Sequence, residues 1–290
     1  MKAKFAALAK YPAPLRILAF LLVLLVIWLP VAAPIALLIP DQNWVTLLTM
    51  PLLFVEFLAL IRLWGKWVHQ ENRILQRYGL VGSRQNGREC LQGLGIGWLS
   101  LMLLFVVQSG LGWIVWRAPS GALLRHIFIG LIVGLGVGFA EELVFRGWML
   151  DELQRDYLPM TALWSNSLIF SGLHFIRPLP EVLQSLPQFF GLVLLGLTLV
   201  WAKQSTRSRI WSASSLSHHQ GRLGLPIGLH AGLVWGYYIV NVGQLVEYSG
   251  RVPEWLTGIN RNPLAGMMGL LFLGAIALYM RWRSVQAQVS

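Results

Sequence analysis

Long apolar runs alternate with short polar segments along the whole chain. Eight such runs stand out, and most of them approach or exceed the roughly 20 apolar residues that a helix needs to cross a hydrocarbon core of about 30 Å. The runs cover residues 17–39, 44–64, 91–116, 127–150, 161–176, 186–202, 225–246 and 264–282. This pattern predicts an all-α fold: a polytopic integral membrane helix bundle of about eight transmembrane helices with short loops.

The composition excludes an ordinary soluble protein. Of the 290 residues, 56% are hydrophobic and 12% are charged, and the mean hydropathy is +0.61, whereas a soluble domain carries about 25% charged residues. The formal net charge of +11 would suggest nucleic-acid binding in a soluble protein. Here the basic residues lie between the apolar runs, so membrane topology explains them and no nucleic-acid partner is expected.

The distribution of Lys and Arg predicts the orientation of the spans. If the N-terminus is cytoplasmic, the segments on that side hold 16 basic residues and the opposite segments hold five. Positive charge accumulates on the cytoplasmic side of membrane proteins, so both termini are expected there, in a multi-pass protein of the cell membrane. The first run follows a basic start, as in a signal peptide, but it is too long to be one.

We expect one membrane domain with three parts. Residues 1–126 would form three spans with a basic cytoplasmic loop at 65–90, residues 127–246 would form the core spans that carry the chemistry, and residues 247–290 would add a last span and a tail. The loop at 65–90 is either an amphipathic helix on anionic lipid or a solvated loop.

Charged residues inside the fourth run carry most of the functional information. A glycine recurs at every fourth position from Gly130 to Gly138, which predicts close packing against another helix. Glu142 and Arg146 continue the same row, in the favourable order for a helical ion pair. Glu141 lies about 100° away around the helix and has no partner nearby in the sequence. Because a charge at the bilayer centre costs roughly 2.5–3.5 kcal/mol, we expect a functional role for Glu141.

Two histidines lie inside later apolar runs. His174 is in the fifth run and His230 is near the start of the seventh, each close to glycines. A glutamate with two imidazoles has two chemical uses. Glu141 can be a general base while the imidazoles orient a water molecule, or the three side chains can be the ligands of a catalytic zinc with one open position. The sequence leaves both uses open, and with them the cofactor.

These motifs resemble a known family. Glu141-Glu142-x-x-x-Arg146, then Phe170-x-x-x-His174, then His230 on a later span, are similar in order and separation to the motifs of the type II CAAX prenyl endopeptidase and bacteriocin-processing family of intramembrane proteases (CPBP, or Abi). The resemblance covers roughly residues 130–238. It implies an eight-span fold and an endopeptidase that hydrolyses a peptide bond of a membrane-associated protein or peptide, prenylated and of CAAX type in the eukaryotic branch.

The resemblance also implies roles for individual residues. Glu141 would activate the water, His174 would position it, and His230 would stabilise the oxyanion. Glu142 and Arg146 would support this first motif. The family leaves open whether a metal is used, in which case Glu141, His174 and His230 would hold a zinc ion.

One position departs from the family pattern. The last motif of the family usually reads His-x-x-x-Asn, but the fourth residue after His230 is Val234, whose side chain cannot donate a hydrogen bond. Two other hypotheses therefore stand beside the protease. One is a catalytically inactive relative that binds peptides or partner membrane proteins, as an immunity or scaffold protein. The other is a transporter or channel that uses the buried charges as an ion path.

Overall fold

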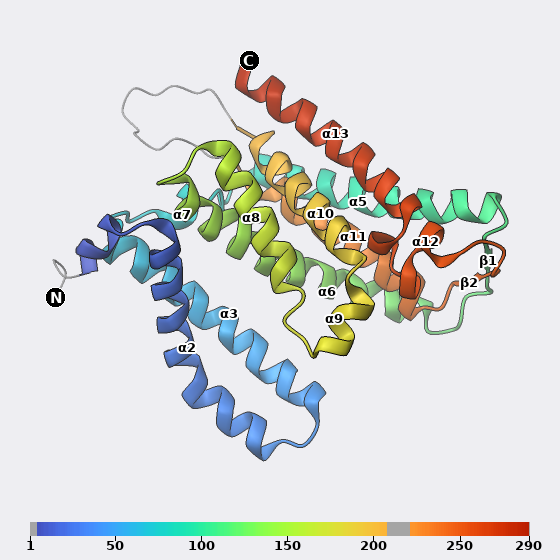
Figure 1. Cartoon of the computed structure of the whole chain (residues 1–290), viewed down its shortest axis with the longest axis horizontal. Coiled ribbons are helices and arrows are strands. Elements are labelled where there is room, and N and C mark those ends of the chain that lie inside the picture. Colours follow the sequence, from blue (N-terminus) through green and yellow to red (C-terminus); the bar gives the residue numbers. More distant parts are fainter. Residues whose placement is uncertain (1–4, 208–220, 290) are drawn as a thin grey trace.

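The protein is almost entirely helical in the computed structural model, which describes residues 5–207 and 221–289. Eight helices of 15 to 27 residues form its body (Figure 1). They are α2 (Ala13–Leu38), α3 (Gln42–Trp67), α5 (Arg84–Gly110), α6 (Leu123–Glu142), α8 (Pro159–Leu173), α10 (Gln188–Gln204), α11 (Gly224–Val242) and α13 (Met267–Val289). The predicted all-α class is confirmed.

Shorter elements connect these helices. They are the 3-10 helix η1 (Ala7–Lys10), α4 (Ile74–Arg77), the π-helix η2 (Leu143–Met149), α7 (Leu150–Gln154), α9 (Leu179–Ser185), α12 (Glu254–Thr257), and the 3-10 turns η3 (Ile259–Arg261) and η4 (Pro263–Ala265). Because α6, η2 and α7 follow one another without a break, residues 123–154 form one long helix with a π-helical segment inside it.

The helices agree in part with the predicted spans. Among the described residues, five helices are long and apolar enough to cross a membrane, or six if α9 and α10, which meet at 71°, form one broken span. The count of eight and the cytoplasmic position of both termini are not confirmed. The α8 helix has only 15 residues, or about 22 Å at 1.5 Å per residue, which is less than the thickness of a hydrocarbon core of about 30 Å.

Glycines allow α11 to pack tightly between α5 and α6. A Cβ atom at Gly228 of α11 would lie 1.8 Å from the carbonyl oxygen of Cys90 in α5. On the other side, a Cβ atom at Gly138 of α6 would lie 2.8 Å from the carbonyl oxygen of Ile227. The predicted glycine row of α6 is therefore a helix contact, and it brings the histidine of α11 next to the glutamates of α6.

Two predicted spans end earlier than expected. The run at 91–116 is helical only as far as Gly110, and the run at 225–246 is helical only as far as Val242. After a short turn, the end of each run belongs to a two-stranded antiparallel sheet, β1 (Ile114–Trp116) and β2 (Val246–Tyr248), in which Ile114 pairs with Tyr248. Hydropathy could not separate these strands from the helices, because short apolar runs suit both structures.

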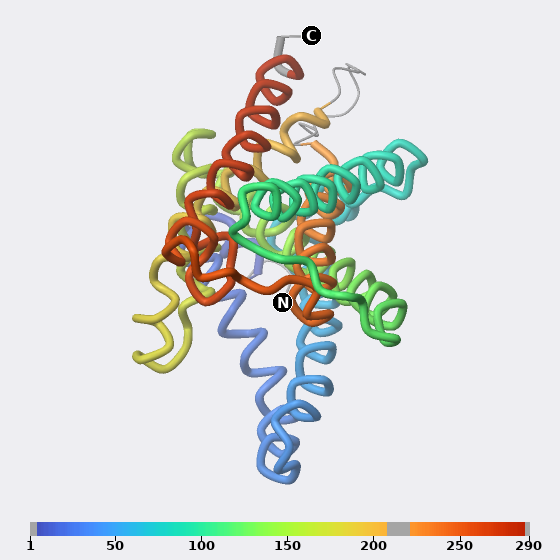
Figure 2. The backbone as a smooth tube through the Cα atoms, turned by 90° about the vertical axis from the view of Figure 1, so that its right-hand side faces the viewer, coloured from blue at the N-terminus to red at the C-terminus, as the bar shows by residue number. Residues whose placement is uncertain are grey.

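The hairpin of α2 and α3 extends away from the other helices and returns to them at its open end (Figure 1 and Figure 2). There the guanidinium of Arg16 donates a 2.8 Å hydrogen bond to the buried carboxylate of Glu152 in α7. The indole of Trp64 donates to the same carboxylate at 3.0 Å, and the ring of His69 lies 2.5 Å from it. The division of the chain into three parts stays a prediction, but this network ties the first part to the second.

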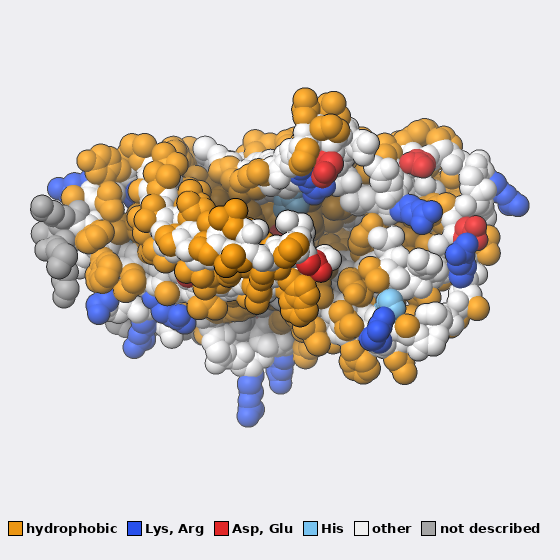
Figure 3. All heavy atoms as spheres, turned by 90° about the horizontal axis from the view of Figure 1, so that it is seen from below, with side chains coloured by type: hydrophobic (Ala, Val, Ile, Leu, Met, Phe, Trp, Pro, Cys, Tyr) orange, Lys and Arg blue, Asp and Glu red, His pale blue; other side chains and the backbone are white. Residues whose placement is uncertain are grey.

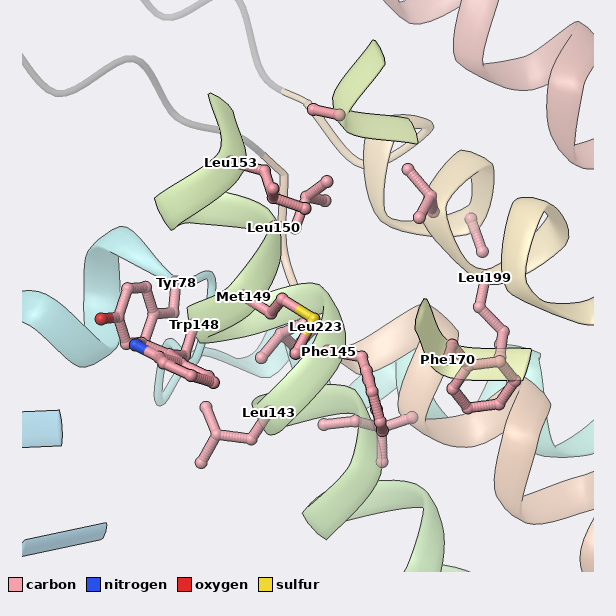
Figure 4. Close-up of a cluster of buried hydrophobic side chains, with 14 of the residues drawn as sticks. Tyr78, Leu143, Phe145, Trp148, Met149, Leu150, Leu153, Phe170, Leu199 and Leu223 are labelled. Carbon is pink, nitrogen blue, oxygen red and sulfur yellow. The ribbon is translucent and has the colours of Figure 1, made fainter. Parts of the chain in front are cut away.

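The π-helix supplies much of the hydrophobic core. Figure 4 shows Leu143, Phe145, Trp148 and Met149 pointing from η2 into clusters of apolar side chains. Trp148 is fully buried and packs against Phe20 of α2, with ring centroids 4.3 Å apart. The segment that follows the two glutamates is therefore anchored on several sides.

Candidate active site

The candidate active site lies where α6 passes into the π-helix. Glu141 and Glu142 are the last two residues of α6, and Arg146 lies within η2. A π-helical segment inside an α-helix is rare and is frequently found at a functional site. The backbone therefore departs from regular α-geometry directly after the two glutamates that the sequence analysis selected.

Glu142 and Arg146 form the predicted ion pair. Nη1 of Arg146 donates to Oε1 of Glu142 at 3.0 Å, and both side chains are completely buried. Nη2 of Arg146 donates to the carbonyl oxygen of Gly196 at 3.3 Å, and the guanidinium lies 4.2 Å from the ring centroid of Phe170. The arginine thus joins α10 and α8 to the glutamate and leaves the carboxylate paired in a low-dielectric interior.

His230 is held by the same carboxylate. Its Nδ1 atom lies 2.9 Å from Oε1 of Glu142. A carboxylate only accepts hydrogen bonds, so the imidazole donates from Nδ1. The other ring nitrogen, Nε2, faces Glu141, whose Oε2 atom is 3.9 Å away. Glu142 therefore fixes the orientation of the ring and directs its free nitrogen toward the second glutamate.

His174 reaches Glu141 from another helix. Its Nδ1 atom lies 2.7 Å from the carbonyl oxygen of Phe170, so this imidazole also donates from Nδ1. Its Nε2 atom is 4.0 Å from Oε2 of Glu141. One oxygen of Glu141 thus faces the Nε2 atoms of both histidines at separations longer than a hydrogen bond and short enough to close by a side-chain rotation or through one water molecule.

These three side chains line one cavity of about 320 Å³. Glu141 and His174 are each about one third exposed, so water reaches the carboxylate. Most of the remaining lining is apolar and comes from α5, α10, α11 and α13. Figure 3 shows a hollow between apolar side chains with a histidine inside it. Val234 lines the cavity as well, so the position that departs from the family pattern belongs to the site.

The predicted zinc-ligand set receives no support from this geometry. Among residues 5–207 and 221–289, no group of three or more His, Cys, Asp or Glu side chains is arranged to hold a metal ion. Glu141, His174 and His230 face one another across the gaps of 3.9 and 4.0 Å given above. The metallo type of the protease is not shown.

Sequence reasoning missed several polar groups around the site. Lys203 lies directly after the predicted run 186–202, but its fully buried ammonium donates a 2.7 Å hydrogen bond to the backbone oxygen of Arg146. Asn166, by contrast, is expected from its spacing of eight residues to share a helix face with His174; it donates to the backbone oxygen of Phe145 at 2.8 Å and does not line the cavity. Nothing in the sequence pattern indicated that Asn262, far along the chain, lines the cavity.

Comparison with known proteins agrees with these motifs. The family model described as Type II CAAX prenyl endopeptidase Rce1-like matches residues 123–236, a segment that contains Glu141, Glu142, Arg146, His174 and His230. This match supports the predicted resemblance to a family of proteases. The match and the apolar helices together indicate a multi-pass membrane protein. No curated protein and no solved structure gave a significant match.

Proposed function

We propose that this protein is an intramembrane endopeptidase that cleaves a peptide bond with a water molecule activated by Glu141. The observation that carries the proposal is the position of the Glu141 carboxylate. It lies within 4.0 Å of two imidazole nitrogens from two other helices, on the wall of a cavity that water can enter. A buried pair that served only to hold helices together would account for Glu142 and Arg146 but not for Glu141.

In this mechanism the carboxylate and His174 act on the water. Glu141 accepts a proton from the water as its oxygen attacks the carbonyl carbon of the scissile bond. Since the Nδ1 proton of His174 is used by the Phe170 carbonyl, the lone pair on Nε2 is available to accept the second hydrogen of the water and to orient its oxygen. The proton held by Glu141 then passes to the leaving amine as the carbon–nitrogen bond breaks.

His230 stabilises the oxyanion of the tetrahedral intermediate. In the imidazolium form, Nδ1 donates to Glu142 and Nε2 donates to the oxyanion. Glu142, whose Oε1 atom lies 2.9 Å from Nδ1 of His230, holds the ring so that Nε2 points toward the reacting carbonyl group.

The substrate proposed is a membrane-associated protein or peptide. The apolar cavity lining suits a lipid-like or apolar segment next to the scissile bond, and the family suggests a prenylated CAAX-type sequence. We propose the cell membrane as the location, with lipid as the surrounding partner.

Cleavage by the purified protein tests the proposal. The protein in lipid nanodiscs is given an internally quenched farnesylated CAAX peptide and its unprenylated counterpart. We expect cleavage, and we expect Glu141→Gln to abolish it while the protein remains folded. His174→Ala and His230→Ala should each lower the rate by about 10²-fold or more, since each removes a group that acts on the water or the oxyanion.

The matched control is Glu56→Gln. Glu56 is another glutamate within an apolar helix, α3, and it does not line the cavity. This variant should cleave like the unmodified protein. Unchanged cleavage by folded Glu141→Gln protein would show that Glu141 is not the base.

A further inference from the structure

A second pocket, smaller and more polar, adjoins the candidate active-site cavity. It has a volume of about 160 Å³ and lies between α11, β2 and the turn η3. Its polar lining includes two guanidiniums, two phenols and two amides, from Arg117, Arg261, Tyr237, Tyr248, Asn241 and Gln244. All of these side chains can donate hydrogen bonds, so the lining favours an anionic ligand.

The two pockets meet at Tyr237, which lines both of them. They also share a wall along the chain, because Arg261 lines the smaller pocket and the next residue, Asn262, lines the larger one. This adjacency favours a single extended ligand that passes Tyr237, with an apolar part in the active-site cavity and a polar end in the smaller pocket.

Arg261 supplies a positive charge that is not neutralised within the pocket. The guanidinium of Arg117 is paired with Glu247 at 2.8 Å, and Glu247 is the only acidic residue of the lining. Arg261 is exposed and has no ion pair among the described residues. Its planar fork suits the two oxygens of a carboxylate.

Tyr248 complements this charge as a neutral donor. Burial, together with the neighbouring Tyr237, raises the pKa of Tyr248 to about 12. The phenol therefore keeps its proton at neutral pH and can donate it to an anion.

The backbone around the smaller pocket is strained. Gln244, Asn260 and Arg261 have φ angles of 50°, 54° and 62°, which is the left-handed region that residues other than glycine rarely adopt. The backbone N–H of Asn260 donates to the carboxylate of Glu254 at 3.3 Å, which helps to hold this conformation. Strained residues of this kind cluster at binding sites. The left-handed backbone at Arg261 sets the direction in which its side chain leaves the chain.

We propose that the pocket formed by Arg261, Tyr237 and Tyr248 binds the C-terminal carboxylate of the peptide whose apolar segment occupies the active-site cavity. The proposal rests on the proposed function for the occupant of that cavity. A terminal carboxylate is an anion that can enter a pocket of this size at the end of a chain. Arg261 and Tyr248 lie outside the matched residues 123–236, so the family match does not assign this subsite.

Binding to an inactive variant tests the subsite apart from cleavage. In the Glu141→Gln background, the dissociation constant of the farnesylated CAAX peptide is measured in its free-acid form and as its C-terminal amide. We expect the acid to bind about tenfold more tightly or better, because a hydrogen bond to a charged group contributes at least that factor. The ratio of the two dissociation constants, amide over acid, measures this preference. Arg261→Gln should bring the ratio close to one, and Tyr248→Phe should lower it. Arg261→Lys should retain part of the preference.

Two control variants and a lipid probe separate carboxylate binding in this pocket from other effects of charge. Arg251→Gln removes an exposed arginine from the same segment outside the pocket, and the acid preference should remain unchanged. The proposal is overturned if acid and amide bind equally, or if Arg261→Gln leaves the ratio unchanged. It is also overturned if the preference for the acid over the amide changes only in Arg177→Gln, a residue that lines the larger cavity. The same holds if Arg261→Gln leaves peptide binding unchanged and alters only the thermal stabilisation of the protein by phosphatidylglycerol vesicles. Loss of cleavage with an intact acid preference would contradict the proposed function and leave the subsite standing.

Discussion

One carboxylate oxygen joins His230 to Arg146. Oε1 of Glu142 lies 2.9 Å from Nδ1 of His230 and 3.0 Å from Nη1 of Arg146. The histidine that we propose for oxyanion stabilisation is therefore oriented by a carboxylate that also pairs with an arginine. The two glutamates of the first motif therefore have different roles. Glu142 is hydrogen-bonded to its buried partners, whereas Glu141 faces the cavity.

Loss of the arginine should unfold part of this arrangement. Arg146→Ala leaves the Glu142 carboxylate buried without its counter-charge, which typically costs about 3–5 kcal/mol. We expect a lower midpoint of thermal unfolding in detergent and loss of cleavage together. Glu141→Gln is the matched comparison and should lose cleavage with little change in the unfolding midpoint, because its carboxylate is partly exposed. An Arg146→Ala protein as stable as the parent would contradict the buried pair.

Val234 offers a test of the oxyanion site. The side chain lines the cavity one helical turn after His230, and valine cannot donate a hydrogen bond. We expect Val234→Asn to raise the cleavage rate, by up to about 10²-fold if the new amide reaches the oxyanion. Steady-state kinetics with the quenched peptide would measure the effect, with Val234→Leu as a control for size. A folded Val234→Asn protein that cleaves more slowly than Val234→Leu would argue against an oxyanion at this position.

Close helix contact makes a glycine of α11 irreplaceable. A Cβ atom at Gly228 would lie 1.8 Å from a backbone oxygen of α5, so Gly228→Ala has to push the two helices apart. Overpacking of this kind costs about 1–3 kcal/mol or more and would displace His230 two residues later. Gly136→Ala is the control, since its Cβ atom would meet nothing within 4 Å. Thermal unfolding and cleavage should be impaired in the first variant only, and equal behaviour of both would refute the contact.

The N-terminal hairpin should depend on one buried carboxylate. Glu152 accepts hydrogen bonds from Arg16 and Trp64 and contacts His69. Glu152→Gln leaves Asp156 as the only carboxylate paired with Arg16 among the described residues, and we expect a loss of about 3–5 kcal/mol of stability. Spin labels on α2 and α6 should report a wider distance distribution by electron resonance. Glu247→Gln breaks an exposed pair and should change stability by about 1 kcal/mol or less; a similarly small effect of Glu152→Gln would show that other contacts hold the hairpin.

The sequence by itself determined the helical class, the membrane environment and the first half of the site. Hydropathy is a property of consecutive residues, and the pairing of Glu142 with Arg146 and the glycine row of α6 follow from the fixed repeat of one helix. The same local rules failed at the ends of two runs, where apolar residues form strands, and they placed the ends of the run at 161–176 two to three residues later than those of α8.

Only the tertiary structure decided which side chains meet. His230 lies 88 residues from Glu142 along the chain, and no sequence spacing fixes how far one helix is rotated or shifted against another. That rotation comes from the fit of the glycines of α6 and α11 against neighbouring backbones. This fit places His230 near Glu141 and turns Val234 into the cavity, while the packing of the other elements brings His174 within 4.0 Å of Glu141 and Arg261 into one pocket with Tyr237. These are relationships between helix surfaces, and they exist only once the helices are packed.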